Sequence, residues 1–208
     1  MLIQISGQEN LSYIVLCPRT ADEWLVLHVD MKSQDILILL KLVSLGVDKP
    51  ADAFNQSARN LAEMTGVGKT EVNKSLNRSI NVGLAINSSL KGFVTVNRKG
   101  LFEFTFFGLS YVFPVRPLEL TRGIPTALAA PVLRDKLLSP GGSIPVWPSA
   151  AGEHMGQAVT PLYKTVPQAV AHDDMLYASL ALVDAIRIGG AREKKIAAEE
   201  LRLLLSIS

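Results

Sequence analysis

The most regular hydrophobic pattern in the chain lies between Ser33 and Leu45. The apolar residues that recur there at helical spacing are Ile36, Leu39, Leu40 and Val43. Leu37 and Leu42 add apolar groups on other faces, so the pattern predicts a helix that is buried on all sides. Gly46 and Pro50 predict the end of this helix soon after Leu45.

Two amphipathic patterns near the C-terminus predict a pair of helices. The first helix begins at an N-cap formed by Asp173 or Asp174 and ends at Ile188. Its apolar stripe consists of Leu176, Leu180 and Val183. A glycine pair at 189–190 separates it from a second predicted helix at about 191–205.

The pattern in residues 1–30 is weaker. Two short β-like runs, Leu11–Leu16 and Trp24–Val29, are separated by Pro18 and polar residues and could form a hairpin. Because Met31 opens the strongest helical segment, residues 1–30 could equally be a dispensable extension that precedes the usual start.

The segment Leu101–Phe113 is compatible with two structures. Its Phe and Thr residues favour a strand by propensity. Its apolar positions do not alternate cleanly, however, and they also fit a buried helix. Gly100 and Gly108 weaken both interpretations, so strand and helix stay open.

Residues 114–167 differ in composition from the rest of the chain. They contain nine of the eleven prolines, which excludes long helices. Trp147, Tyr163 and many Val, Leu and Ala residues make the segment too apolar for a solvated linker. We therefore expect an irregular but largely ordered layer packed onto the helices.

Composition excludes several kinds of chemistry. The single cysteine, Cys17, rules out an internal disulfide. The three histidines do not have metal-site spacing, and no nucleophile sits in a recognisable catalytic motif. We expect no metal, no cofactor and no enzymatic activity. No apolar run reaches the roughly 18 residues of a membrane span, and the N-terminus lacks the basic region of a signal peptide, so we expect a cytoplasmic protein without a membrane partner.

The positive charge of the chain is concentrated in one segment. The formal net charge is only +2. Residues 56–99, however, contain seven cations and two anions, so their net charge is 7 − 2 = +5. The rest of the chain then has a net charge of 2 − 5 = −3. A local basic surplus of this kind is typical of a surface that binds phosphate.

The same segment contains the pattern of a helix-turn-helix at about 56–85. This motif needs two short helices, a turn of three or four residues that often includes Gly, and apolar residues that hold the second helix against the first. Leu61 and Ala62 supply the inner face of the first helix, and Gly66 lies where the chain must turn. The residues expected to face inward afterwards are Val67, Val72, Leu76 and Ile80.

The second helix of this pattern should begin near Lys69 and present a polar outer face. The candidate DNA-binding residues on and beside this face are Lys69, Thr70, Asn73, Lys74, Asn77 and Arg78. Asparagine amides can contact base edges. Lysine and arginine more naturally hold phosphates, which fixes the register of the helix on the duplex.

At these residues the chain resembles the bacterial winged-helix transcriptional regulators, loosely those of the MarR type. The resemblance covers roughly residues 31–85 and implies that Ser33–Leu45 is the first helix of a three-helix core. It also implies a homodimer that binds double-stranded DNA, and a β-hairpin wing. The wing candidate is Phe93–Phe106, with residues 97–100 as its turn. The dimerisation helices of the family are not recognisable, although the C-terminal pair could serve.

Two other interpretations compete with DNA binding. Gly66–Thr70 resembles the end of a phosphate-binding loop, but that motif needs a Gly where this chain has Glu63, and it must follow a strand. Nucleotide binding is therefore excluded. The remaining alternative is a winged-helix adaptor, or an antitoxin-like partner of another protein, that does not bind DNA and uses residues 101–166 and the tail.

The sequence thus predicts a mainly α protein in four parts. These are an N-terminal extension (1–30), a winged-helix-like DNA-binding domain (31–112), an irregular Pro-rich layer (113–172) and a C-terminal helical pair (173–208). The predicted function is sequence-specific transcriptional regulation through the helix-turn-helix.

Overall fold

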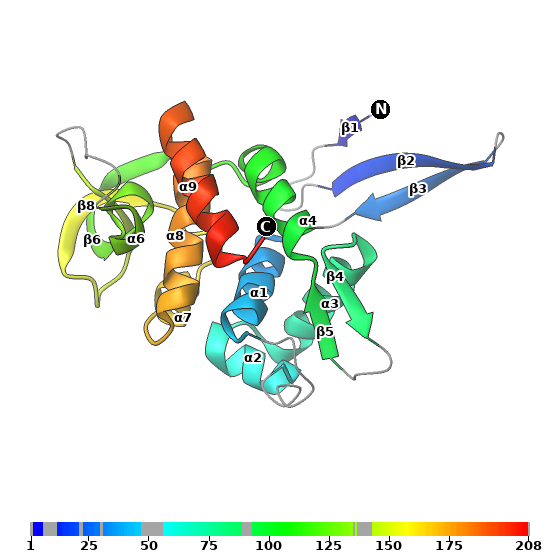
Figure 1. The fold of residues 1–208 in the computed structure, drawn as a ribbon, viewed down its shortest axis with the longest axis horizontal. Helices are drawn as coiled ribbons and strands as arrows, with labels where there is room; N and C mark the ends of the chain where they lie inside the picture. Colours follow the sequence, from blue (N-terminus) through cyan, green and yellow to red (C-terminus); the bar gives the residue numbers. More distant parts are fainter. Residues whose placement is uncertain are drawn as a thin grey trace.

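The computed structural model describes residues 2–5, 12–20, 23–29, 31–46, 56–88, 93–134, 136 and 143–207. Figure 1 shows helices at the centre of the molecule, a small barrel on one side, and two sets of antiparallel strands on the other. Helix predominates over strand among these residues, in coarse agreement with the mainly α expectation. None of the helices in the described ranges is long and apolar enough to cross a membrane.

Helix α1 (Ser33–Ser44) lies at the centre of the fold, as its all-round apolar pattern predicts. Residues 34–43 are all buried, and Ile36 and Leu39 have no exposed surface. Helices α2 (Ala58–Thr65), α3 (Lys69–Asn81) and α8 (Asp174–Ile188) pack around it. The core of the molecule therefore forms on several faces of one short helix.

The N-terminal strands pair as the β-like runs indicate. Strand β2 (Ser12–Thr20) is antiparallel to β3 (Glu23–Val29), which confirms the predicted hairpin. A further strand, β1 (Leu2–Ile5), pairs with the other edge of β2. In Figure 1, β2 and β3 extend away from the helices.

A second hairpin follows α3. It pairs Phe93–Val96 with the strand before it, whereas the predicted hairpin paired this segment with the residues after it. Strands β4 (Ala85–Ser88) and β5 (Phe93–Val96) pair in antiparallel register. The predicted hairpin Phe93–Phe106, with its turn at residues 97–100, is wrong. The side chain of Asn97 accepts a hydrogen bond from the Gly100 N–H at 3.0 Å and thereby caps a helix where the turn was expected.

The segment after Asn97 is a continuous helix with a π-helical turn in its middle. It consists of α4 (Arg98–Glu103), the π turn Phe104–Gly108 and α5 (Leu109–Val112). Of the two structures considered for Leu101–Phe113, the helix is therefore correct. The wider π turn lengthens the helical period, so that the buried residues recur every four positions, at 101, 105 and 109.

The Pro-rich segment contains more regular structure than expected. Strands β6 (Pro117–Pro125), β7 (Pro145–Pro148) and β8 (His154–Val159) close into a three-stranded barrel, so the prediction of an irregular layer is wrong for these residues. Prolines occupy the first and last positions of β6 and β7, where a missing N–H costs few ladder hydrogen bonds. Gly123 is required by close packing, because a Cβ there would lie 2.1 Å from the Trp147 carbonyl oxygen.

Short helical turns and two long helices complete the chain. The turns are Ala127–Ala129, α6 (Pro131–Arg134) and α7 (Val166–Ala169). The predicted C-terminal pair is confirmed as α8 and α9 (Ala191–Leu204), which pack against each other.

A buried carboxylate on α8 holds the barrel against the helices. Asp184 accepts hydrogen bonds from Trp147 Nε1 at 2.5 Å, from Thr126 Oγ1 at 3.1 Å and from Arg187 Nη1 at 2.7 Å. Arg187 also donates through Nε to the carbonyl oxygen of Phe113 at 3.0 Å. Since each buried polar group finds partners, this cluster fixes α8 relative to both the barrel and the end of α5.

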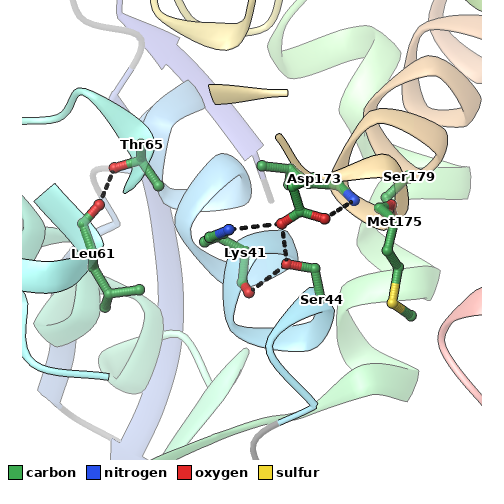
Figure 2. A network of polar contacts seen from close by, with 8 residues as sticks. Lys41, Ser44, Leu61, Thr65, Asp173, Met175 and Ser179 are labelled. Atoms are coloured by element: carbon green, nitrogen blue, oxygen red, sulfur yellow. Dashed lines mark hydrogen bonds and ion pairs between the residues drawn. The ribbon is translucent and has the colours of Figure 1, made fainter. Parts of the chain in front are cut away.

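A second polar cluster joins α1 to the start of α8, and Figure 2 shows it from close by. Of the two N-cap candidates, Asp173 caps α8, and its Oδ1 accepts from the Leu176 N–H at 2.8 Å. Its Oδ2 lies 2.6 Å from Lys41 Nζ and 2.7 Å from Ser44 Oγ. Burial raises the pKa of Asp173, but the hydrogen bonds outweigh burial and hold that pKa below its ordinary value.

We predict that Asp173→Asn destabilises the protein at neutral pH by about 1–3 kcal/mol, because asparagine can still cap α8 but leaves Lys41 buried without its counter-charge. The folded-state pKa of Asp173 is lowered, so the carboxylate contributes stability above the ordinary value of 3.8 and loses it as the pH falls through the folded-state pKa. Urea unfolding should therefore show a penalty that shrinks below about pH 4. A penalty of equal size at pH 7 and pH 3 would contradict this assignment.

Candidate functional site

Helices α2 and α3 form the predicted helix-turn-helix. The Ser57 side chain accepts from the Asn60 N–H at 3.3 Å and caps α2. Gly66 ends α2 with a φ of +68°, a conformation that favours glycine. Val67 is 1% exposed and anchors the turn in the core, while Val72 does the same for α3. The predicted turn at Gly66 and the inward-facing positions Val67 and Val72 are confirmed.

Five of the six candidate residues share the outer face of α3. Residues Lys69, Thr70, Asn73, Lys74 and Asn77 are all exposed. Residues 70, 73, 74 and 77 follow the i, i+3, i+4, i+7 spacing of a single helical face, and Lys69 flanks them at the start of the helix. The elements that pack on α3 are α1, α2 and β4, and they contact its opposite side. No element in the described part of the chain packs over the outer face, so it is accessible to a large partner.

The sixth candidate, Arg78, points into the protein. Its Nε donates to Asp35 Oδ2 at 2.9 Å and its Nη2 donates to Asp35 Oδ1 at 2.6 Å, a two-pronged pair with a carboxylate that has no exposed surface. Nη2 also lies 2.9 Å from Glu71 Oε1. The structure thus separates Arg78 from the exposed row, and its guanidinium fastens α3 to α1.

The pairing of Arg78 also changes the electrostatics of the exposed face. Glu71 accepts from Arg78 and, at 3.0 Å, from Gln34 Nε2. Partial burial raises the pKa of Glu71, but these hydrogen bonds and the charge of Arg78 outweigh it and lower that pKa overall. Both carboxylates beside α3, Glu71 and Asp35, are therefore paired with Arg78 inside the protein. Lys69 and Lys74 are left as the exposed charges of the row.

The α1 residues of this network were missed by sequence reasoning, although a signal was present. Asp35 and Lys41 are the charged residues within a helix predicted to be buried on all sides. A buried charge needs a partner of opposite sign. Each of the two has one in the structure, Arg78 for Asp35 and Asp173 for Lys41.

The β4–β5 hairpin lies directly after α3 and is tied to the start of α2. The Gln56 amide donates to the Val94 carbonyl oxygen at 3.1 Å and accepts from the Val94 N–H at 2.9 Å, so it extends the edge of β5 as a strand would. Ile86 on β4 is 60% exposed. Lys91, counted in the basic segment, lies outside the described residues, as do residues 89–92 that connect the two strands.

The described part of the chain contains no group of three or more His, Cys, Asp or Glu side chains that could hold a metal ion. Asp173 in the run His172–Asp174 is occupied as the N-cap of α8 and the partner of Lys41. Among the described residues, the outer face of α3 is both charged and exposed. It is also the face that the helix-turn-helix pattern predicts to be the binding surface.

We predict that Arg78→Ala destabilises the protein by about 3–5 kcal/mol, because it leaves the Asp35 carboxylate buried and unpaired. Arg78→Lys should recover only part of the loss, since an ammonium group cannot bind both carboxylate oxygens as a guanidinium does. Lys74→Ala, on the exposed row, should change stability by no more than about 0.5 kcal/mol. Denaturant unfolding of the three variants measures this, and equal stabilities for Arg78→Ala and Lys74→Ala would refute the network.

No model of a known protein family matches the chain, and no curated protein or solved structure matches it either. What the outer face of α3 can do is therefore inferred from its own geometry and chemistry.

Proposed function

We propose that the protein is a sequence-specific regulator of transcription that binds double-stranded DNA through α3. The observation that carries the proposal is the exposed row on α3, which combines two lysines, two asparagines and Thr70 on a helix held by its other side. An α-helix has the width that the major groove admits. A face of hydrogen-bond donors without an unpaired carboxylate suits the negatively charged duplex.

The members of the row have different roles in this proposal. Lys69 and Lys74 bind phosphates and position the helix, whereas Asn73 and Asn77 contact base edges. Gly68 at the N-cap of α3 offers no side chain to cap the helix. The first backbone N–H groups of α3 are therefore available to donate hydrogen bonds to a DNA phosphate.

The hairpin supports a winged-helix interpretation of this unit. In the proposal, α1, α2 and α3 form the three-helix core and β4–β5 is the wing. The wing follows α3 after a short turn, and Asn97 Nδ2 donates to the Gly83 carbonyl oxygen at 2.9 Å, which links the two ends of the hairpin. A wing in this position contacts the DNA backbone beside the groove that α3 enters.

The alternative is an adaptor that binds another protein and no DNA. One observation favours it, namely the apolar side chains exposed on the barrel. Leu118 is 54% exposed, Leu120 is 67% exposed and Met155 is 66% exposed. Exposed apolar residues that cluster on one surface are typical of protein contacts. They lie on β6 and β8, in a different part of the chain from the row on α3.

We predict that Lys69→Ala/Lys74→Ala weakens binding to all duplexes and lowers the slope of log affinity against log salt by about 1.8, since each lost phosphate contact lowers it by about 0.9. Fluorescence anisotropy with mixed-sequence duplexes at several salt concentrations measures the slope. Arg78 is left intact, so that the variant stays folded.

The matched control is Arg192→Ala/Lys195→Ala, which removes two exposed cations from α9 and should leave the slope unchanged. Equal effects of the two double variants would show non-specific attraction and contradict a binding role for α3. Absence of binding at low salt by folded wild-type protein would favour the adaptor.

A further inference from the structure

The outer face of α3 has short polar side chains in its middle and a lysine at each edge. Successive residues of an α-helix are turned by about 100° around its axis. The exposed candidates of α3 therefore span an arc of about 140°. Around the axis they follow each other in the order Lys69, Asn73, Asn77, Thr70 and Lys74. A lysine at each edge can reach the phosphates that border a groove, while the shorter side chains between them face the base edges.

The two side chains of α3 that suit G·C pairs are turned away from this face. Arginine is the residue that most often binds guanine, and a carboxylate can accept a hydrogen bond from cytosine N4. Helix α3 contains one arginine, Arg78, and one carboxylate, Glu71. The two bind each other at 2.9 Å, and Arg78 also binds the buried Asp35. Both are therefore engaged inside the protein and not available to a G·C pair.

The residues in the middle of the face have the chemistry that suits A·T pairs. An asparagine amide donates to adenine N7 and accepts from the adenine N6 amino group, so it recognises adenine through two hydrogen bonds. Asn73 and Asn77 are exposed, and no partner among the described residues holds either amide. Thr70 is exposed too, and its methyl group can pack against the methyl group of thymine.

We infer that α3 recognises A·T base pairs, with Asn73 and Asn77 each bound to an adenine and Thr70 packed against a thymine methyl group. The two asparagines are separated by four residues, which is about 6 Å along the helix. Neighbouring base pairs are stacked at roughly 3.4 Å, so the two amides bind different base pairs. Lys69 and Lys74 bind the backbone and contribute no base preference.

This inference rests on the proposed function, because it names the bases that the DNA-binding face selects. The two can nevertheless fail separately. Absence of DNA binding, or binding that selects no sequence, would refute the proposed function. Selection of duplexes in which the essential pairs are G·C would leave sequence-specific binding in place and would refute the inference alone.

Base analogues test the two adenine contacts. The wild-type protein first selects a duplex from a random library, and each adenine of that duplex is then replaced by 7-deazaadenine, which lacks N7 but still pairs with thymine. We expect two adenines at which the replacement weakens binding about tenfold. In Asn77→Ala, one of the two replacements should lose its effect and the other should keep it, and Asn73→Ala should show the reverse.

The thymine contact has a test of its own. Replacement of thymine by uracil, which lacks the methyl group, should weaken binding of wild type at one position of the selected duplex. The same replacement should have no effect on Thr70→Ser, a variant that keeps the hydroxyl and loses the methyl group.

A change of base preference is the strictest test. Asn77→Arg places a guanidinium in the middle of the face and should change the preferred base at its position from adenine to guanine. The matched control, Lys69→Ala/Lys74→Ala, should bind every duplex more weakly and keep the preference for adenine. All the substituted residues are exposed, so thermal unfolding should remain as in wild type. Insensitivity of every adenine to the analogue, or an unchanged preference in Asn77→Arg, would overturn the inference.

Discussion

The fold depends on the pairing of two charges that are carried by one buried helix. Helix α1 is covered on all sides and is otherwise almost entirely apolar, yet it contains Asp35 and Lys41. Leaving Asp35 unpaired in the core would cost about 3–5 kcal/mol, and leaving Lys41 unpaired would cost about 1–3 kcal/mol. Asp35 is satisfied by Arg78 of α3, and Lys41 is satisfied by Asp173 at the start of α8. One helix therefore fixes the helix-turn-helix on one side and the C-terminal half on the other.

This constraint also shapes the candidate DNA-binding face. Because Arg78 is needed by Asp35, it faces inward and holds Glu71 as well. The exposed side of α3 is then left with lysines, asparagines and a threonine. A helix that is tied from behind by a two-pronged ion pair presents these side chains on a rigid support, which is what a recognition surface requires.

Much of the fold could be predicted because it follows from local patterns. The periodicity of α1, α8 and α9 and the glycine of the helix-turn-helix depend on residues that are close in sequence, and the structure confirms them. The errors have two causes, a local signal that fits two structures and, in the barrel, pairing between residues far apart in the sequence. Phe93 begins a strand that pairs with the preceding strand, Ala85–Ser88, and not with the residues that follow it. Asn97 caps a helix, although the sequence near it resembles a turn. The barrel depends on pairing between residues 117–125 and 145–159, which no local pattern reveals.

The candidate site was predicted in the same partial way. Helical spacing placed Lys69, Asn73 and Lys74 on one outer face, and that placement is correct. Spacing alone could not show that Arg78, at the edge of this face, has a buried partner 43 positions away in the sequence. The charge pattern of α1 contained that information, since a carboxylate in an apolar helix requires a cation from elsewhere.

The central claim, that α3 reads DNA sequence, is tested most directly by separating sequence discrimination from affinity. A duplex selected from a random library by the wild-type protein would be compared with a scrambled duplex, using Asn73→Ala and Asn77→Ala. Each variant should bind the scrambled duplex as wild type does and lose affinity for the selected one, by about 1–3 kcal/mol. Equal losses on both duplexes, or no loss on either, would contradict base recognition by α3.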